Sequence, residues 1–310
     1  MKSWIAEMET MQFGKGVMSQ GYQDVLLNII FENIPLNNTP GFCVEFGFDG
    51  NSFSEGYGAN SAALVLNQGW NNLYLDGSHA NEEINLHRHF LTPSNITDVF
   101  RQHNVPPVPD YISIDVDSID LWLFRAILKE YRASVFSVEY NCNFPLSAAI
   151  TANEEFFWNC DRAYGASLKA LNMVAEEHGY VLLWVVPTLD VFFIRRDLVD
   201  DGSPSICFPL SKWAGATGIP YHPPVRERER LDCFLDYETF QRSGGDITAS
   251  RRDAKAVCRR WLMESCWETI ALRVCQLGRA PLLRECRKRL AIRTRIRKVL
   301  DCMAAIVRRA

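Results

Sequence analysis

The chain has 310 residues, of which 47% are hydrophobic and 12% aromatic, with 33 Lys and Arg against 37 Asp and Glu. This composition can build a sizeable core, which argues against intrinsic disorder, and no stretch reaches the roughly 18 apolar residues that a membrane span needs. The charge is uneven: residues 251–310 hold 17 basic and 5 acidic residues, which leaves 16 basic and 32 acidic residues in the first 250. We expect an acidic body and a basic C-terminal region with different partners.

The first residues, MKSWIAEMETMQ, lack the apolar core of a signal peptide. The ten cysteines are scattered, without any C-x-x-C pair. We therefore expect reduced thiols and a cytoplasmic location.

Short β-rich runs alternate with helical patterns between residues 41 and 197. The predicted strands are 41–48, 70–77, the first residues of 90–104, 109–117, 133–141, 180–186 and 191–198. The predicted helices are 61–69, 78–89, the remainder of 90–104, 121–131 and 165–179. Ser78 and Ser94 are the expected N-caps of two of these helices, and Gly69 and Gly179 are expected to end two others.

Strands that alternate with helices predict right-handed crossovers and a mainly parallel α/β sheet covered on both faces. The last two strands are joined by PTLD, residues 187–190, which is a hairpin signal. The hairpin would place one antiparallel strand in this sheet.

Acidic side chains interrupt the apolar strands near their C-terminal ends. These residues are Glu45, Asp76, Asp115, Asp117 and Glu139. In open α/β sheets, ligands bind outside the carboxyl ends of the strands. We expect the five carboxylates to converge on a ligand site at this edge.

The first of these strands runs into VEFGFDG, residues 44–50. Gly47 would permit a tight turn and a close approach of a ligand to the backbone. Asp76 follows Glu45 by 31 residues, at the end of the second strand, where an acid can bind ribose hydroxyls. Asp76 could instead serve only an Asp-Gly turn. Together the two stretches favour a nucleoside site.

The stretch SIDVDSID brings Asp115, Asp117 and Asp120 together. Clustered carboxylates raise one another's pKa or bind a hard cation, and a carboxylate perturbed in this way can act as a general base. Alternatively, Asp117 or Ser118 caps the following helix. Glu139, between Val138 and Tyr140, needs a ligand or a polar partner if it is buried.

Eight short stretches of the chain resemble an FkbM-like branch of the class I S-adenosylmethionine-dependent methyltransferases, over about residues 19–200. They are SQGYQD (19–24), VEFGFDG (44–50), GWNNLYLDGS (69–78), PSNITDVF (93–100), DYISIDVDSIDLWLFRAI (110–127), VFSVEYN (135–141), YGASLKALNMVAEEHGY (164–180) and VFFIRRDL (191–198). Their order and spacing are more specific than any one of them.

The resemblance implies a Rossmann-like, doubly wound sheet of seven strands, mostly parallel with an antiparallel last strand, and S-adenosyl-L-methionine as cofactor. It assigns the cofactor to Glu45, Gly47, Asp49 and Gly50 around the methionine part, Asp76 at the ribose, Asn95 and Ile96 near the adenine, and Asp115. Asp117 and Glu139 would be the catalytic residues at the mouth where the methyl group moves.

Three regions are expected along the chain: a methyltransferase-like domain at 1–200 with its core at 41–197, an irregular extension at 201–243, and a basic helical tail at 244–310. The stretch 244–250 is the expected linker. Apolar residues spaced along 292–306 predict an amphipathic helix with an arginine-rich face. Its partner stays open: the acidic body of this chain, a second subunit, an anionic membrane or nucleic acid.

These features favour an enzyme that methylates a hydroxyl group of a sugar, glycan or small metabolite, with Asp117 or Glu139 taking the proton. A second hypothesis treats Asp115-x-Asp117 as the metal-binding motif of a nucleotide-sugar glycosyltransferase. A third hypothesis is a non-catalytic methyltransferase-like protein whose basic tail binds a membrane or nucleic acid.

Overall fold

The computed structural model of the chain describes residues 3–47, 50–53, 58–199, 209–219 and 228–258. Contacts divide the chain into two units, Met1–Val257 and Cys258–Ala310. The first unit includes the expected linker at 244–250, while the predicted amphipathic helix at 292–306 and Asp49 lie outside the described residues. Within the described ranges, no helix is long and apolar enough to cross a membrane.

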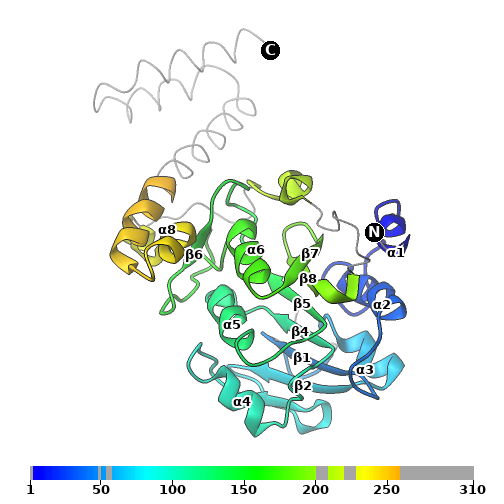
Figure 1. The fold of residues 1–310 in the computed structure, drawn as a ribbon. Coiled ribbons are helices and arrows are strands. Elements are labelled where there is room, and N and C mark those ends of the chain that lie inside the picture. Colours follow the sequence, from blue (N-terminus) through cyan, green and yellow to red (C-terminus); the bar gives the residue numbers. More distant parts are fainter. Residues whose placement is uncertain (1–2, 48–49, 54–57, 200–208, 220–227, 259–310) are drawn as a thin grey trace, which may run out of the picture. The chain divides into compact units, whose positions relative to one another are not determined.

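Seven strands form one sheet in the order β3-β2-β1-β4-β5-β8-β7 (Figure 1). Their bounds are β1 Phe42–Phe46, β2 Asn71–Asp76, β3 Leu86–Arg88, β4 Tyr111–Ile114, β5 Val135–Glu139, β7 Tyr180–Val185 and β8 Asp190–Arg195. The first five pair in parallel, and β8 lies antiparallel between β5 and β7. The predicted seven-stranded α/β sheet with an antiparallel last strand is confirmed.

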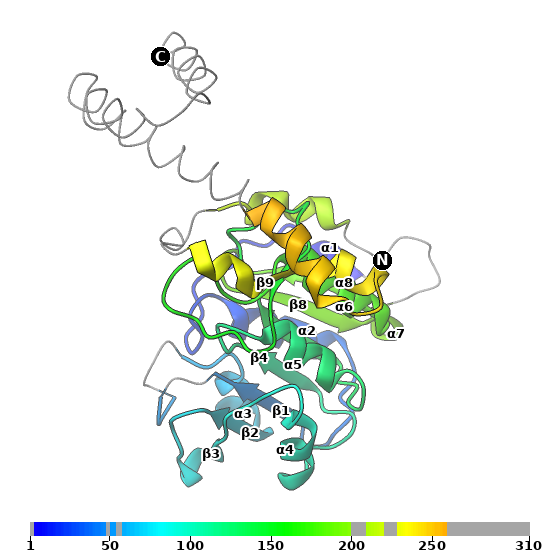
Figure 2. The same ribbon diagram turned by 90° about the vertical axis from the view of Figure 1, so that its left-hand side faces the viewer.

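Two layers of helices enclose the sheet (Figures 1 and 2). The helices α1 Ser3–Met8, α2 Gln23–Asn33 and α3 Ala62–Gln68 lie on one face, and α4 Ile96–Gln102, α5 Asp120–Ile127 and α6 Leu168–Glu177 lie on the other. A short helix, α7 Arg196–Val199, follows β8. Strands β4 and β7 are buried along their whole length, as expected for strands covered on both faces.

Large apolar side chains fill both interfaces between the sheet and the helices. On the first face, Leu26 and Ile30 of α2 belong to one buried cluster with Phe192 of β8. On the second face, Phe124 of α5 packs against Phe136 of β5, with ring centroids 5.0 Å apart. Burying such side chains contributes roughly 1.5–3 kcal/mol each, so this packing holds the strand ends in place.

Three of the predicted helices form nearly as expected. Gly69, with φ of 67°, ends α3, and Ser167 caps α6 by accepting a hydrogen bond from the Ala170 amide. The predicted helix at 78–89 is wrong. This segment contains the 3-10 turn η1 Glu82–Ile84 and the edge strand β3, and Ser78 caps no helix.

The brief strand expected at the start of 90–104 does not form there, because the third strand is β3, which ends at Arg88. The helix expected next does form, as α4, but Asn95 rather than Ser94 stands at its N-cap position.

A second, two-stranded sheet lies beside the main one and was not predicted. It pairs β6 Ile150–Ala152 with β9 Phe234–Asp236, and the helix α8 Tyr237–Arg242 follows. The stretch 201–243 therefore contributes ordered elements in its described part, including η2 Leu210–Ala216 and η3 Arg228–Cys233. Trp122 of α5 donates to the Ala152 carbonyl at 2.7 Å and packs on Phe240, which joins the small sheet and α8 to the main domain.

Candidate functional site

The C-terminal edge of the parallel strands is built around a close approach of two loops. Gly47 follows β1 with φ of 84°, and a Cβ atom there would lie 1.4 Å from the carbonyl oxygen of Asp115. Only glycine fits this position, because any side chain would collide with the backbone that leaves β4. Gly47 thus brings the β1 loop against the residues that follow β4. Gly50, the next glycine of the predicted cofactor loop, is buried.

Glu45 is buried at the end of β1 with its carboxylate fully engaged by the protein. Its Oε1 accepts from the Asn60 amide at 2.7 Å, and its Oε2 accepts from the Ser61 amide and hydroxyl at 2.9 and 2.5 Å. Burial raises the pKa of Glu45, against the lowering effect of these hydrogen bonds. Glu45 therefore holds the turn that begins α3, and its predicted contact with a cofactor stays a prediction.

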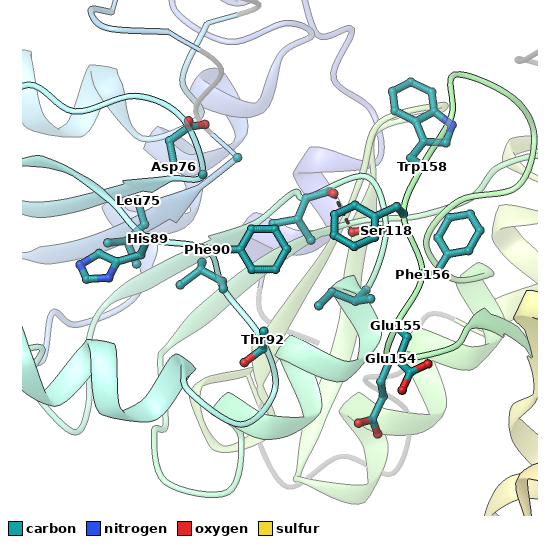
Figure 3. A pocket seen from close by; sticks show the side chains of 16 residues that line it. Leu75, Asp76, His89, Phe90, Thr92, Ser118, Glu154, Glu155, Phe156 and Trp158 are labelled. Carbon is teal, nitrogen blue, oxygen red and sulfur yellow. Dashed lines mark hydrogen bonds between the residues drawn. The ribbon is translucent and has the colours of Figure 1, made fainter.

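A cavity of about 570 Å³ opens at the same edge, beside Gly47 (Figure 3). Asp76 and Leu75 lie at one side of it, while Phe156, Trp158 and the carboxylates of Glu154 and Glu155 lie at the other. Its wall is completed by the residues after β3 and after β4, namely His89, Phe90, Leu91, Thr92, Val116, Ser118 and Ile119. The cavity thus has largely apolar walls, with Asp76 at one end and Glu154 and Glu155 at the other.

Asp76 ends β2 at the rim of this cavity with a side chain only 11% exposed. Its Oδ1 accepts from the amides of Ser78 and His79 at 2.6 and 2.7 Å and contacts His79 Nδ1 at 3.0 Å. The turn role predicted for Asp76 is therefore confirmed, and its predicted contact with a ribose stays a prediction. Asp76 organises the turn after β2, as an Asp-Gly turn residue does, and it also lines the cavity.

Asn95 and Ile96 were expected near an adenine ring, but neither lines the cavity. Asn95 accepts from the Thr92 amide at 2.8 Å and donates to the Phe90 carbonyl at 2.9 Å, and Ile96 is fully buried. The residues that face the cavity from this loop are Phe90, Leu91 and Thr92. Asn95 shapes the cavity wall by holding the loop.

Next to the cavity, Asp115, Asp117 and Glu139 bring one carboxylate oxygen each within 4.8 Å of one another. Asp115 and Asp117 follow β4, and Glu139 ends β5, the neighbouring strand. The structure thus unites three of the five predicted strand-end acids in one cluster. We call these three residues the acidic cluster.

Burial and mutual repulsion both act on this cluster. The pKa of Asp115 and that of Glu139 lie well above their usual range, first because both carboxyls are buried and then because neighbouring carboxylates repel the charged forms. Oxygen atoms that converge in this way are the ligands that hard divalent cations prefer.

The loop between β4 and α5, which carries Asp115 and Asp117, is held by Asp120, the first residue of α5. Its carboxylate accepts from the amides of Val116 and Ser118 at 2.8 and 3.0 Å, and burial raises its pKa to about 7. Asp117 adopts φ of 56° within this loop. The expected cap by Asp117 or Ser118 is absent: Ile119 is the N-cap residue of α5, and no side-chain hydrogen bond caps this helix.

Two parts of the site were not singled out from the sequence. The stretch EEFFW, residues 154–158, supplies the wall opposite Asp76. The sequence feature that could have identified it is a run of three aromatic residues directly after two acids. The other is Asp190, buried at the start of β8, whose Oδ2 accepts from Gln23 Nε2 at 2.7 Å and Asn60 Nδ2 at 3.3 Å. Asp190 pairs in register with Glu139 and adds a further carboxylate beside the acidic cluster.

The fold and this edge define a Rossmann-like α/β protein with a cavity and an acidic cluster at the carboxyl ends of its parallel strands. No protein-family model and no curated protein matches the sequence. The function is therefore argued from the geometry of the site.

Proposed function

We propose that this protein is an S-adenosyl-L-methionine-dependent methyltransferase that acts on a hydroxyl group of a sugar, glycan or small metabolite. The observation that carries the proposal is the cavity with Asp76 at its rim, directly beside the acidic cluster. A cavity with an acid at its rim and a cluster of carboxyl groups thus lie at one edge of the sheet. In folds of this class, that edge is where nucleotide ligands bind.

The cavity suits the adenosine part of this cofactor. Asp76 stands at the end of β2, where an acid accepts hydrogen bonds from ribose hydroxyls. Leu91 and Ile119 offer apolar walls to a flat base. The rings of Phe90 and Phe157 stack with their centroids 5.7 Å apart, and 60% and 68% of the surface of these residues stays exposed. These exposed rings provide aromatic surface that a bound purine would cover.

The methionine part would extend past Gly47 toward the acidic cluster, because Gly47 lines the cavity and packs on Asp115. Catalysis would consist mainly of aligning the acceptor oxygen with the methyl carbon. As the new O–CH₃ bond forms, the C–S bond breaks and its electron pair returns to sulfur, while the hydroxyl proton passes to Asp117 or Glu139. A carboxylate with a raised pKa accepts that proton more readily than an ordinary one.

Calorimetric titration with S-adenosylhomocysteine tests the proposal. We expect saturable binding to the wild type. In Asp76→Asn the affinity should fall roughly tenfold or more, because a charge-assisted hydrogen bond to the ribose is lost. Asparagine retains an oxygen that accepts from the Ser78 and His79 amides, so the turn survives. Asp98→Asn, at an exposed position on α4, is the control and should bind as the wild type does. Absence of heat at high micromolar ligand would refute the proposal.

The acidic cluster also supports a second candidate, the metal-dependent nucleotide-sugar glycosyltransferase with Asp115-x-Asp117 as its metal motif. That enzyme would bind UDP only when Mn²⁺ is present, and it would not bind S-adenosylhomocysteine. The third hypothesis, a non-catalytic protein with a binding tail, depends on residues outside the described part of the chain and stays a prediction.

A further inference from the structure

The acidic cluster contains a buried oxygen atom that no hydrogen bond satisfies. Glu139 Oε2 is shielded from solvent and has no hydrogen-bond partner among the described residues. An oxygen of the same carboxylate lies within 4.8 Å of oxygens of both Asp115 and Asp117. Burying a carboxylate without a partner is costly, so this oxygen indicates a ligand that supplies positive charge.

We propose that Asp115, Asp117 and Glu139 form a binding site for a divalent cation of the Mg²⁺ or Mn²⁺ class. A cation placed between the three carboxylates would satisfy Glu139 Oε2 and cancel the repulsion within the cluster. The binding of the cation itself is independent of the function proposed above.

The charges around the cluster favour a cation strongly. The four charges that act most on Glu139 are the carboxylates of Asp115, Asp117, Asp120 and Asp190. Asp190 accepts hydrogen bonds from Gln23 and Asn60, and Asp120 accepts them from the Val116 and Ser118 amides. We therefore do not count these two carboxylates among the metal ligands. Three inner carboxylates with two outer ones beside them make a site that attracts a cation and repels an anionic ligand.

The ligand set identifies the class of metal ion. All three ligands are carboxylate oxygens, and no histidine or cysteine in the described part of the chain shares the group. Hard cations such as Mg²⁺ and Mn²⁺ prefer oxygen ligands, whereas zinc sites are typically rich in nitrogen and sulfur. Three carboxylates that bind through one oxygen each would leave about three positions of an octahedron open to water or to a substrate oxygen.

The open coordination positions suggest how the acceptor binds, an inference that rests on the proposed methyltransferase function. An acceptor hydroxyl bound to the cation would be held beside the sulfonium end of the cofactor, and the positive charge would lower the pKa of that hydroxyl. The acceptor class would then be one that presents an oxygen ligand to a metal ion. The three carboxylates would hold and orient it, with one of them available for the proton.

Electron paramagnetic resonance of Mn²⁺ tests the site directly, with the full chain stripped by EDTA and then dialysed. We expect the wild type to bind one Mn²⁺, and we expect Glu139→Gln and Asp117→Asn each to weaken binding roughly tenfold or more. The matched control is Glu32→Gln, which changes an exposed acid of α2 outside the cluster and the cavity. Thermal unfolding with and without Mn²⁺ shows that each variant is folded, and only the wild type and the control should gain stability from the ion.

No Mn²⁺ bound by the wild type at millimolar ion would overturn the proposal, and so would equal binding in the wild type and both cluster variants. Titration with S-adenosylhomocysteine in the same samples separates the two proposals. Metal binding without nucleoside binding would reject the methyltransferase and retain the cation site. Nucleoside binding without metal binding would reject the cation site, and the carboxylates would then face the positive charge of the cofactor alone.

Discussion

Individual acids at the strand ends do different work although they occupy similar positions in the sequence. Glu45 accepts hydrogen bonds from Asn60 and Ser61, whereas one oxygen of Glu139 has no hydrogen-bond partner among the residues that the structure describes. The strand-end positions were predictable because a carboxylate interrupts an otherwise apolar run. The partners were not predictable, because they come from other elements that only the folded chain brings near.

Replacement of Glu45 by glutamine should destabilise the protein. The glutamine amide would place an NH₂ group against the backbone amide of Asn60 or Ser61, both of which need an acceptor. We expect Glu45→Gln to lower the free energy of unfolding by roughly 1–3 kcal/mol, measured by urea denaturation. Glu32→Gln, on the exposed end of α2, should change it by less than about 0.5 kcal/mol. Equal stabilities of the two variants would show that the Glu45 hydrogen bonds do not matter.

Among the elements, the segment from the end of β2 through β3 departs most from expectation. The polar sequence SHANEEINLHRH looked helical, yet Leu86–Arg88 adds to the sheet edge beside β2. An edge strand exposes one side to solvent, so it lacks the apolar run that identifies a buried strand. The small β6–β9 sheet escaped prediction for another reason: its two three-residue strands are far apart in the chain and carry no periodicity.

Asn95 should control the order of the loop from β3 to α4. Asn95→Ala removes the acceptor of the Thr92 amide and the donor to the Phe90 carbonyl. We expect faster hydrogen exchange at the Thr92 amide and a loss of about 1–2 kcal/mol of stability. Affinity for S-adenosylhomocysteine should fall as well, since Phe90, Leu91 and Thr92 line the cavity.

Ser94→Ala serves as the control for Asn95, because Ser94 is exposed and, among the described residues, its hydroxyl forms a hydrogen bond only with Thr92 Oγ1. Its exchange pattern should match the wild type. Unchanged exchange at Thr92 in Asn95→Ala would contradict the role assigned to Asn95.

For the whole molecule, the parallel sheet concentrates buried carboxyl groups at one edge. The alternation of strands and helices was enough to predict that architecture, since crossover handedness leaves few arrangements. The cavity wall at 154–158 and the contribution of Asp190 required the tertiary structure, because neither lies at the end of a parallel strand. The accumulated burial of acids has a consequence for stability as a function of pH.

Asp120 provides the clearest case, since burial raises its pKa to about 7 from an unfolded value near 4. Between those values the folded state holds a proton that the unfolded state has lost, so stability falls as pH rises. We expect the free energy of unfolding in EDTA to fall from pH 6 to pH 8 more steeply in the wild type than in Asp120→Asn. The difference in slope should approach about 1.4 kcal/mol per pH unit below pH 7.

The lowered pKa values of His89 and His103 make the free energy of unfolding rise with pH near pH 6. Both histidines are present in the wild type and in Asp120→Asn, so their effect cancels when the two slopes are compared. Identical slopes for wild type and Asp120→Asn would contradict the raised pKa.

A crystal structure of the protein with S-adenosylhomocysteine tests the central claim most directly. We predict an adenine ring between Leu91 and Ile119, a ribose hydroxyl within hydrogen-bond distance of Asp76, and the sulfur atom pointing toward Asp115, Asp117 and Glu139. A cavity without ligand at saturating concentration, or an adenine ring bound elsewhere on the molecule, would contradict the assignment of this edge as a methyltransferase site.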